Sequence, residues 1–144
     1  MKNMKENTKK TVRILLRANS TYQSEMDESL SIQRELIIEE VKKHQNWILD
    51  SKEYIVGNNV GDKDSVTDIN VLQAALRDAE NREYDILVSD KDDRLGRRML
   101  EIPMNIMSLK QLGVDVYTVK DGLLTLDLGD ITGMLMLSMR YAMA

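Results

Sequence analysis

Short apolar runs alternate with amphipathic helical patterns along this chain, and no other feature constrains its fold as strongly. Residues 12–16 form an apolar run of the kind found in a strand that is buried on both faces. Further strands are predicted over residues 47–55, 84–88, 114–119 and 123–126. Helices are predicted over residues 29–44, 71–81, 101–112 and from 130 onward. This alternation predicts an α/β domain, with a mostly parallel sheet of four to five strands flanked by helices.

Local signals mark where the helices begin and end. Ser29 is a typical N-cap for the first helix and Asp68 for the second, because their side-chain oxygens accept hydrogen bonds from free backbone N–H groups. Gly113 is the expected stop of the third helix, since glycine readily adopts the left-handed conformation found there. The polar stretch 18–28 is interpreted as a functional loop or an irregular connection.

The last predicted helix is apolar on almost every side. Its apolar residues include Ile131, Met134, Leu135, Leu137, Met139 and Met143. A helix without a polar face has to be buried all round. Two interpretations satisfy this condition: a core helix rich in adaptable Met side chains, or a helix that packs one face on the domain and the other on a partner subunit. The stretch is too short to span a bilayer, and it carries Arg140.

Length and composition indicate one globular domain. We expect residues 1–10 to be a disordered tail, residues 11–144 to be the domain, and the terminal helix 130–144 to be truncated. The absence of Cys excludes disulfides and thiolate metal sites and favours a cytoplasmic location. The net charge of −4 argues against unaided DNA binding, because phosphate neutralisation supplies most of the affinity of DNA-binding proteins.

Two polar segments follow strands that are expected to end at the same edge of the sheet. Residues 93–98 follow the third strand, and Arg94 and Arg97 can point the same way from one turn. Residues 17–23 follow the first strand and begin with Arg17. Guanidinium groups bind phosphate oxygens through paired, charge-assisted hydrogen bonds. Since ligands bind at the carboxyl ends of parallel strands, the segments indicate a phosphate site, although each alone is also typical of a solvated loop.

Together these segments resemble the N-terminal catalytic domains of serine recombinases, which include resolvases, invertases and large phage and transposon integrases. That family carries Arg-x-Ser-[Ser/Thr]-x-x-Gln after the first strand, then Ser-[Ile/Leu]-x-x-Gln, and Asp-Arg-[Leu/Phe]-[Gly/Ser]-Arg after a later strand. The corresponding segments here are residues 17–23, 29–33 and 93–97. Residues 110–119 resemble the family's helix-to-strand turn, and residues 132–135 resemble the start of its long dimerisation helix.

The resemblance implies site-specific DNA recombination without a metal or another cofactor. A serine, here Ser20, attacks a DNA phosphodiester, forms a 5′-phosphoserine link and releases a 3′-hydroxyl group. Stabilisation of the transition state and positioning of the reacting groups are assigned by the resemblance to Arg17, Arg94, Arg97, Gln23 and Asp93. The implied partners are DNA, bound through a C-terminal DNA-binding region outside this chain, and further copies in a homodimer and a synaptic tetramer. No membrane is involved.

Three positions depart from the family pattern. Counted along the motif without a gap, Asn19 occupies the nucleophile position, and Ser20 follows one residue later. An amide cannot attack phosphorus in this way. Val56 stands where the family has an acid after the second strand, and Ile69 where it has a phosphate-binding arginine. These departures favour an alternative function, a catalytically inactive homologue that serves as a dimerising or regulatory interaction module.

A third interpretation is an unrelated open α/β domain that binds a small phosphate ligand or receives a signal. Residues 17–23 contain no Gly, which argues against a phosphate loop, and no acids cluster directly after the first strand, as a receiver domain needs. His44 is interpreted as an ordinary helix-end residue and Trp47 as a core residue. A solvated connection, rather than a metal site, is the interpretation of Asp121, Asp127 and Asp130.

Overall fold

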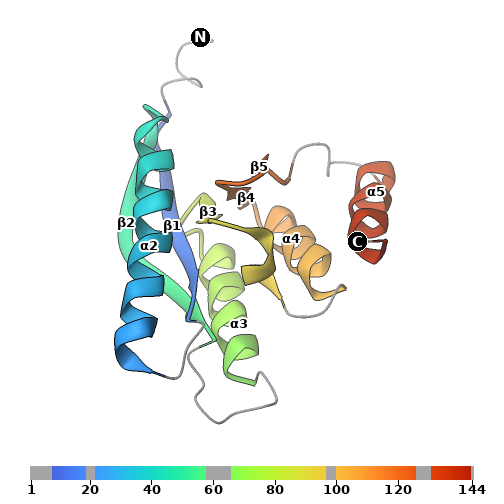
Figure 1. Cartoon of the computed structure of the whole chain (residues 1–144). Coiled ribbons are helices and arrows are strands. Elements are labelled where there is room, and N and C mark those ends of the chain that lie inside the picture. Colours follow the sequence, from blue (N-terminus) through green and yellow to red (C-terminus); the bar gives the residue numbers. More distant parts are fainter. Residues whose placement is uncertain (1–7, 19–21, 58–65, 97–99, 126–130, 144) are drawn as a thin grey trace.

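The computed structural model contains a five-stranded sheet with helices on both faces (Figure 1). The structure describes residues 8–18, 22–57, 66–96, 100–125 and 131–143. The strands are β1 (Lys10–Arg17), β2 (Trp47–Val56), β3 (Ile86–Ser89), β4 (Asp115–Thr118) and β5 (Gly122–Leu123). The helices are α2 (Gln23–Lys42), α3 (Val66–Glu80), the short 3₁₀ helix η1 (Asp92–Leu95), α4 (Glu101–Gln111) and α5 (Ile131–Ala142). The predicted α/β class with a mostly parallel sheet is confirmed.

Strand β1 lies inside the sheet, between β2 and β3. The strand order is β2-β1-β3-β4-β5, with β5 antiparallel to β4 and the other neighbours parallel. Val12 pairs with Ile86, and Arg17 at the end of β1 pairs with Val56 at the end of β2. The carboxyl ends of β1, β2 and β3 therefore meet at one edge of the sheet, as a parallel arrangement requires.

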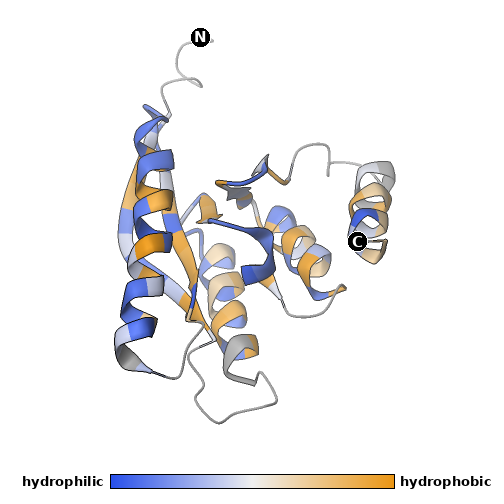
Figure 2. Ribbon diagram, in the orientation of Figure 1, coloured by the Kyte–Doolittle hydropathy of each residue, from blue (hydrophilic) through white to orange (hydrophobic). Residues whose placement is uncertain are grey.

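Each face of the sheet has its own apolar core. Helix α2 covers one face, where Ile37 and Val41 pack against Val12, Ile14 and Leu16 of β1. Helices α3, α4 and α5 cover the other face, in a core that includes Leu15 of β1. Figure 2 shows β1 mainly in hydrophobic colours, which agrees with its burial on both faces. Continuous apolar strands of this kind are typical of parallel sheets that carry helices on both sides.

Helix α2 begins at Gln23, so the prediction that Ser29 caps this helix is wrong. The interpretation of the whole stretch 18–28 as a loop is also wrong from residue 23 onward. Met26 is buried in the first turn and anchors it, while Ser24 and Glu25 are exposed on the outer side. Because this first turn has a single apolar residue, the helical period of the apolar residues did not reveal it.

Two further boundaries differ from the sequence prediction. Helix α3 begins at Val66, so Asp68 lies inside the helix and does not cap it. Strand β3 begins at Ile86, two residues later than expected, and the preceding Tyr84 is buried and donates its hydroxyl to the carbonyl of Ala75 at 2.8 Å. The end of α4 agrees with the prediction, since Gly113 adopts a left-handed φ of +89°.

Helix α5 buries one side and exposes the other. Leu137 and Tyr141 pack into the core beside α4, whereas the exposed fractions of Leu135, Met136 and Met139 are 59%, 67% and 58%. The helix is therefore not buried all round within this chain. Figure 1 shows it beside α4, at the opposite end of the molecule from α2.

No helix in the described ranges is both long enough and apolar enough to cross a membrane. Of the tail predicted over residues 1–10, residues 1–7 lie outside the described part, and β1 already begins at residue 10.

The inner strand β1 carries a buried arginine on the face toward α3. The guanidinium of Arg13 donates to Asp50 Oδ2 at 2.6 Å, to Tyr54 Oη at 2.8 Å, to Asp78 Oδ2 at 3.2 Å and to Glu83 Oε1 at 3.3 Å. These acceptors come from β2, from α3 and from the segment after α3. A buried charge is tolerated only when it is paired and hydrogen-bonded in this way.

A bulge in β2 supplies part of this network. Val12 pairs with Leu49 but Ile14 pairs with Glu53, so residues 50–52 together stand opposite a single residue of β1. Lys52, in the bulge, donates to Asp78 Oδ2 at 2.7 Å.

Burial by itself would raise the pKa of Asp78, but hydrogen bonds from Lys52 and Tyr54 hold it below its ordinary value. The hydrogen bond from Arg13 likewise lowers the pKa of Asp50. Because both pKa values are lower in the folded state, these carboxylates stabilise the fold at neutral pH, and this stabilisation is lost as the pH falls through the folded-state pKa values.

We predict that Arg13→Met lowers the free energy of unfolding by about 3 kcal/mol, because it removes the buried cation that joins Asp50, Asp78 and Glu83 and leaves only Lys52 to balance the charge of the buried Asp78. The control is Arg34→Met, which removes a half-exposed arginine paired with Glu53 at 2.8 Å and should cost less than about 1 kcal/mol. Urea unfolding followed by circular dichroism measures both. Equal losses in the two variants would contradict a special role for the buried network.

Candidate functional site

The two polar segments lie side by side at the carboxyl edge of the sheet. Arg17 ends β1, and its Nη2 donates a hydrogen bond to the backbone carbonyl of Asp93, in η1, at 3.0 Å. This contact joins positions 76 residues apart in the sequence. It follows from the pairing of β1 with β3, since η1 comes directly after β3.

The side chain of Gln33 fixes the backbone of Arg17. Its Oε1 accepts from the Arg17 N–H at 3.0 Å, and its Nε2 donates to the Arg17 carbonyl at 2.7 Å and to Ser29 Oγ at 3.2 Å. Gln33 is buried, so the amide takes the place of a neighbouring strand at the end of β1. The position of Gln33 in the Ser-x-x-x-Gln segment was the only sequence signal for this residue. That signal did not predict the hydrogen bonds of Gln33 to the backbone of Arg17.

A glycine lets the segment after β1 approach β2 closely. Gly57 follows β2 with a left-handed φ of +80°, and a Cβ atom there would lie 2.5 Å from the carbonyl oxygen of Ala18. Ala18 in turn donates its N–H to the carbonyl of Val56 at 2.8 Å. Any other residue at position 57 would push Ala18 away, so this glycine helps set the position of Ala18 beside the end of β2.

Arg94 is held by carboxylates of its own segment. Its Nε donates to Asp90 Oδ1 at 2.9 Å and its Nη2 to Asp90 Oδ2 at 3.1 Å, while Nη1 lies 3.1 Å from Asp93 Oδ1. Arg94 and Asp90 are both 7% exposed. The guanidinium thus makes a two-pronged ion pair with Asp90, a residue that the sequence analysis did not single out.

The η1 turn is also tied to the two following helices. Asn105 of α4 donates to the carbonyl of Leu95 at 2.6 Å, and Leu95 is fully buried. Tyr141 of α5 donates its hydroxyl to Asp92 Oδ2 at 2.5 Å. Burial and this hydrogen bond raise the pKa of Tyr141, so the phenol stays protonated. Helix α5, the predicted partner-facing helix, therefore contacts the candidate site directly.

The remaining predicted site residues are only partly described. Asn19, Ser20 and Arg97 lie outside the described residues. Gln23 is the first residue of α2, and its side chain also lies outside the described part. The two departures from the family pattern that the structure describes are Val56, fully buried at the end of β2, and Ile69, exposed on α3.

His44 and Trp47 belong to an aromatic cluster away from this edge. Their rings stack with centroids 3.6 Å apart, and Tyr117 of β4 meets both edge-on. Tyr117 donates to Glu40 at 2.9 Å, and the ring nitrogen Nε2 of His44 lies 3.1 Å from the same carboxylate oxygen. The cluster caps the α2 side of the sheet, so His44 has more partners than an ordinary helix end.

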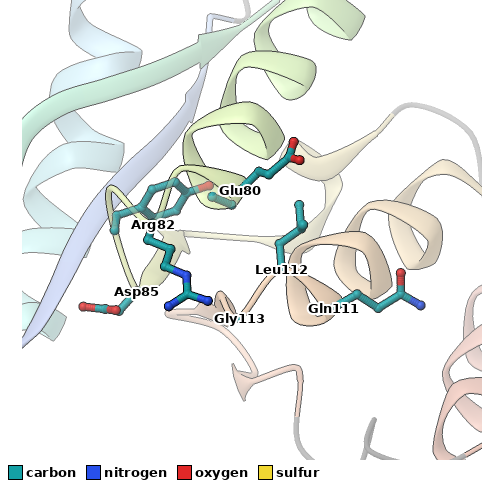
Figure 3. A pocket seen from close by; sticks show the side chains of 8 residues that line it. Glu80, Arg82, Asp85, Gln111, Leu112 and Gly113 are labelled. Atoms are coloured by element: carbon teal, nitrogen blue, oxygen red, sulfur yellow. The ribbon is translucent and has the colours of Figure 1, made fainter.

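The described residues show no metal cluster at the candidate site, and a hollow in the structure lies elsewhere. Within the described ranges, no three His, Asp or Glu side chains lie together as metal ligands. A hollow of about 480 Å³ opens at the amino edge of the sheet, between the ends of α3 and α4. Figure 3 shows Glu80, Arg82 and Gln111 around it.

Comparisons with known proteins agree with this architecture. A family model described as "Resolvase, N terminal domain" matches residues 17–144. The N-terminal catalytic domain of TP901-1 integrase is similar in structure, with a TM-score of 0.67, 22% sequence identity and 93% of each chain covered. No match is found among curated protein sequences.

Two further solved structures share the fold. A resolvase family site-specific recombinase from Streptococcus pneumoniae matches with a TM-score of 0.69 and 16% identity, over 94% of this chain and 87% of that one. The C-terminal catalytic domain of ISC1926 TnpA, an IS607-like serine recombinase, matches with a TM-score of 0.55 and 16% identity, over 90% and 77%. At these identities the likeness establishes the fold.

We predict that Gln33→Leu destabilises the fold by about 1–3 kcal/mol, because it leaves the N–H and carbonyl of Arg17 without their partner. Backbone hydrogen exchange at Arg17 should accelerate more than exchange in the middle of β1. The matched control is Gln73→Leu on α3, where the side chain is exposed and the loss should be small. Unchanged exchange at Arg17 in the Gln33 variant would contradict the role of the Gln33 amide in holding the backbone of Arg17.

Proposed function

Because this chain belongs to the resolvase family of serine recombinases and comprises the N-terminal catalytic domain, we propose that it cleaves and rejoins DNA through a serine nucleophile, Ser20. The observation that carries the proposal is the contact between Arg17 and Asp93 at the carboxyl edge of the sheet. It brings together the two segments that match the family motifs, and Ser20 follows Arg17 by three residues in the sequence.

The proposed reaction is a transesterification. The Ser20 oxygen forms a bond to phosphorus, the bond from phosphorus to the 3′-oxygen breaks, the serine hydroxyl loses its proton and the leaving oxygen gains one. The product is a 5′-phosphoserine link beside a free 3′-hydroxyl. Since the ester bond is exchanged and not hydrolysed, the reverse step rejoins DNA without a nucleotide cofactor. Arg17, Arg94 and Arg97 stabilise the negative charge of the transition state, with Gln23 and Asp93 as positioning groups.

The alternative is an inactive homologue that acts as a dimerising or regulatory module. Two described positions favour it. Val56 is fully buried and apolar where the family has an acid, and Ile69 places an exposed apolar side chain where the family has an arginine. Asn19 adds a third departure, at the nucleophile position itself. In this alternative the domain folds and associates but forms no covalent link to DNA.

The proposed partners are DNA and further copies of this chain, in a cytoplasmic setting. The net charge of −4 means that a separate DNA-binding region supplies most of the grip on DNA. The exposed apolar side of α5 supports a homodimer, because a contiguous apolar helix face in water is costly unless a partner covers it. We propose that the dimer pairs into a tetramer when two DNA sites are brought together.

We predict that the protein, together with its DNA-binding region, forms a covalent adduct with nicked DNA duplexes drawn from the flanks of its gene. The adduct should survive denaturing electrophoresis, and mass spectrometry of its peptides should place the nucleotide on Ser20. Ser20→Ala should abolish the adduct, whereas Asn19→Ala should leave it in place because the amide takes no part in bond formation.

Two controls make this test decisive. Each variant is first shown to fold and to bind the same duplex, so that loss of the adduct reports chemistry alone. If the parent binds DNA as a dimer yet gives no adduct, and Asn19→Ser then gives one, the inactive homologue is the correct function. An adduct that persists in Ser20→Ala would exclude Ser20 as the nucleophile.

We predict that Met136→Glu together with Met139→Glu converts the dimer to a monomer, because the charges would be buried at the α5 interface. Sedimentation velocity measures the change in molecular mass. The control is Leu36→Glu, which places a charge at an exposed apolar position of α2, on the other face of the sheet. A parent that sediments as a monomer at high concentration, or a control that also dissociates, would contradict the assignment of this interface.

A further inference from the structure

Asp90 is bound to the Nε and Nη2 groups of Arg94, the pair of donors through which a guanidinium commonly binds a phosphate. Two parallel N–H groups, Nε and Nη2, point at the two carboxylate oxygens of Asp90 at 2.9 and 3.1 Å. A phosphate would be bound by the same pair of donors, since carboxylate and phosphate oxygens have matching spacing. Nη1 is also engaged, 3.1 Å from Asp93.

We propose that Asp90 is an internal competitor for the DNA phosphate, which has to release Arg94 before this arginine can bind the scissile group. The inference rests on the proposed function, because it concerns the same phosphate site. It adds a residue that holds the site in a resting state, an autoinhibitory contact within one turn of chain.

Burial makes the ion pair hard to open. Both residues are only 7% exposed, so solvent can compensate little for the loss of either partner. Asp90 is fixed by its position directly after β3, where its carbonyl accepts from the Lys120 N–H at 3.1 Å. Arg94 is fixed by its fully buried neighbour Leu95. Moving Arg94 to a phosphate would leave a buried carboxylate without a partner, which is strongly unfavourable.

The charges of the turn act in the same direction. Residues 90–94 contain three carboxylates and two cations, which gives a net charge of −1. A phosphodiester that approaches this turn therefore meets net repulsion until Arg94 is freed.

A competing explanation makes the opposite prediction. If Asp90 only orients Arg94 for phosphate, removing its charge should weaken the binding of a phosphodiester. If Asp90 competes with phosphate, removing its charge should strengthen binding. The substitution Asp90→Asn separates the two, because Asn keeps the shape and one acceptor oxygen while it removes the negative charge.

The experiment titrates the chain with a dinucleoside monophosphate, which carries a single phosphodiester, and follows the arginine Nε–H signals by NMR. We expect Asp90→Asn to bind this probe at least about 10-fold more tightly than the parent, with a shift of the Arg94 signal. The control is Asp92→Asn, which removes a charge from the same turn but from a carboxylate that binds Tyr141. It should gain no more than about twofold, from the change in net charge alone.

Unchanged or weaker binding by Asp90→Asn would overturn the proposal, and so would a gain of equal size in Asp92→Asn. A second variant, Asp90→Ser, also removes the negative charge and serves should Asp90→Asn fail to fold: it should show the same gain in affinity, and unchanged or weaker binding would overturn the proposal. The titration measures the binding of the probe and does not require that any bond in it is cleaved. A chain that forms no adduct through Ser20 can therefore still show the competition, and the two proposals fail separately.

Discussion

The burial of β1 on both faces is the constraint on which the rest of the structure depends. A strand that packs Ile14 against α2 and Leu15 against the opposite core cannot lie at an edge, because its backbone groups need partners on both sides. It therefore pairs with β2 and β3, and parallel pairing brings their carboxyl ends to one edge. The proximity of Arg17 to Asp93 is a consequence of this packing.

The same burial explains why the arginines of the fold are held by oxygens of the chain itself. Arg13 is enclosed on β1 and needs carboxylates from three segments, and Arg94 is enclosed in η1 and needs Asp90. Arg17 is less buried and bonds to a carbonyl. Burial and the negative charge of their acceptors thus determine how firmly Arg13 and Arg94 are held.

The sequence predicted the parts of the molecule in which apolar periodicity is strong. The class of fold, the order of its elements and the end of α4 at Gly113 agree with the structure. The predicted start of α2 was wrong because Met26 is the only buried apolar residue of its first turn. The prediction that Asp68 caps α3 was wrong because a residue that is common at helix caps can also lie inside a helix. Contacts of the site such as Gln33 with Arg17 and Asp92 with Tyr141 depend on tertiary packing. No local pattern in the chain encodes them.

Several residues in the segments that match the family motifs make contacts that stabilise the fold whether or not the protein is catalytically active. Gln33 completes the end of β1, Asp93 offers its carbonyl to Arg17, and Arg94 neutralises a buried carboxylate. Each of these contacts would be needed in an active enzyme and in an inactive homologue alike. The motif match therefore argues strongly for the fold and weakly for cleavage. Cleavage depends on the hydroxyl of Ser20 and on whether a phosphate can displace Asp90 from Arg94, because these are the two features that packing alone does not require.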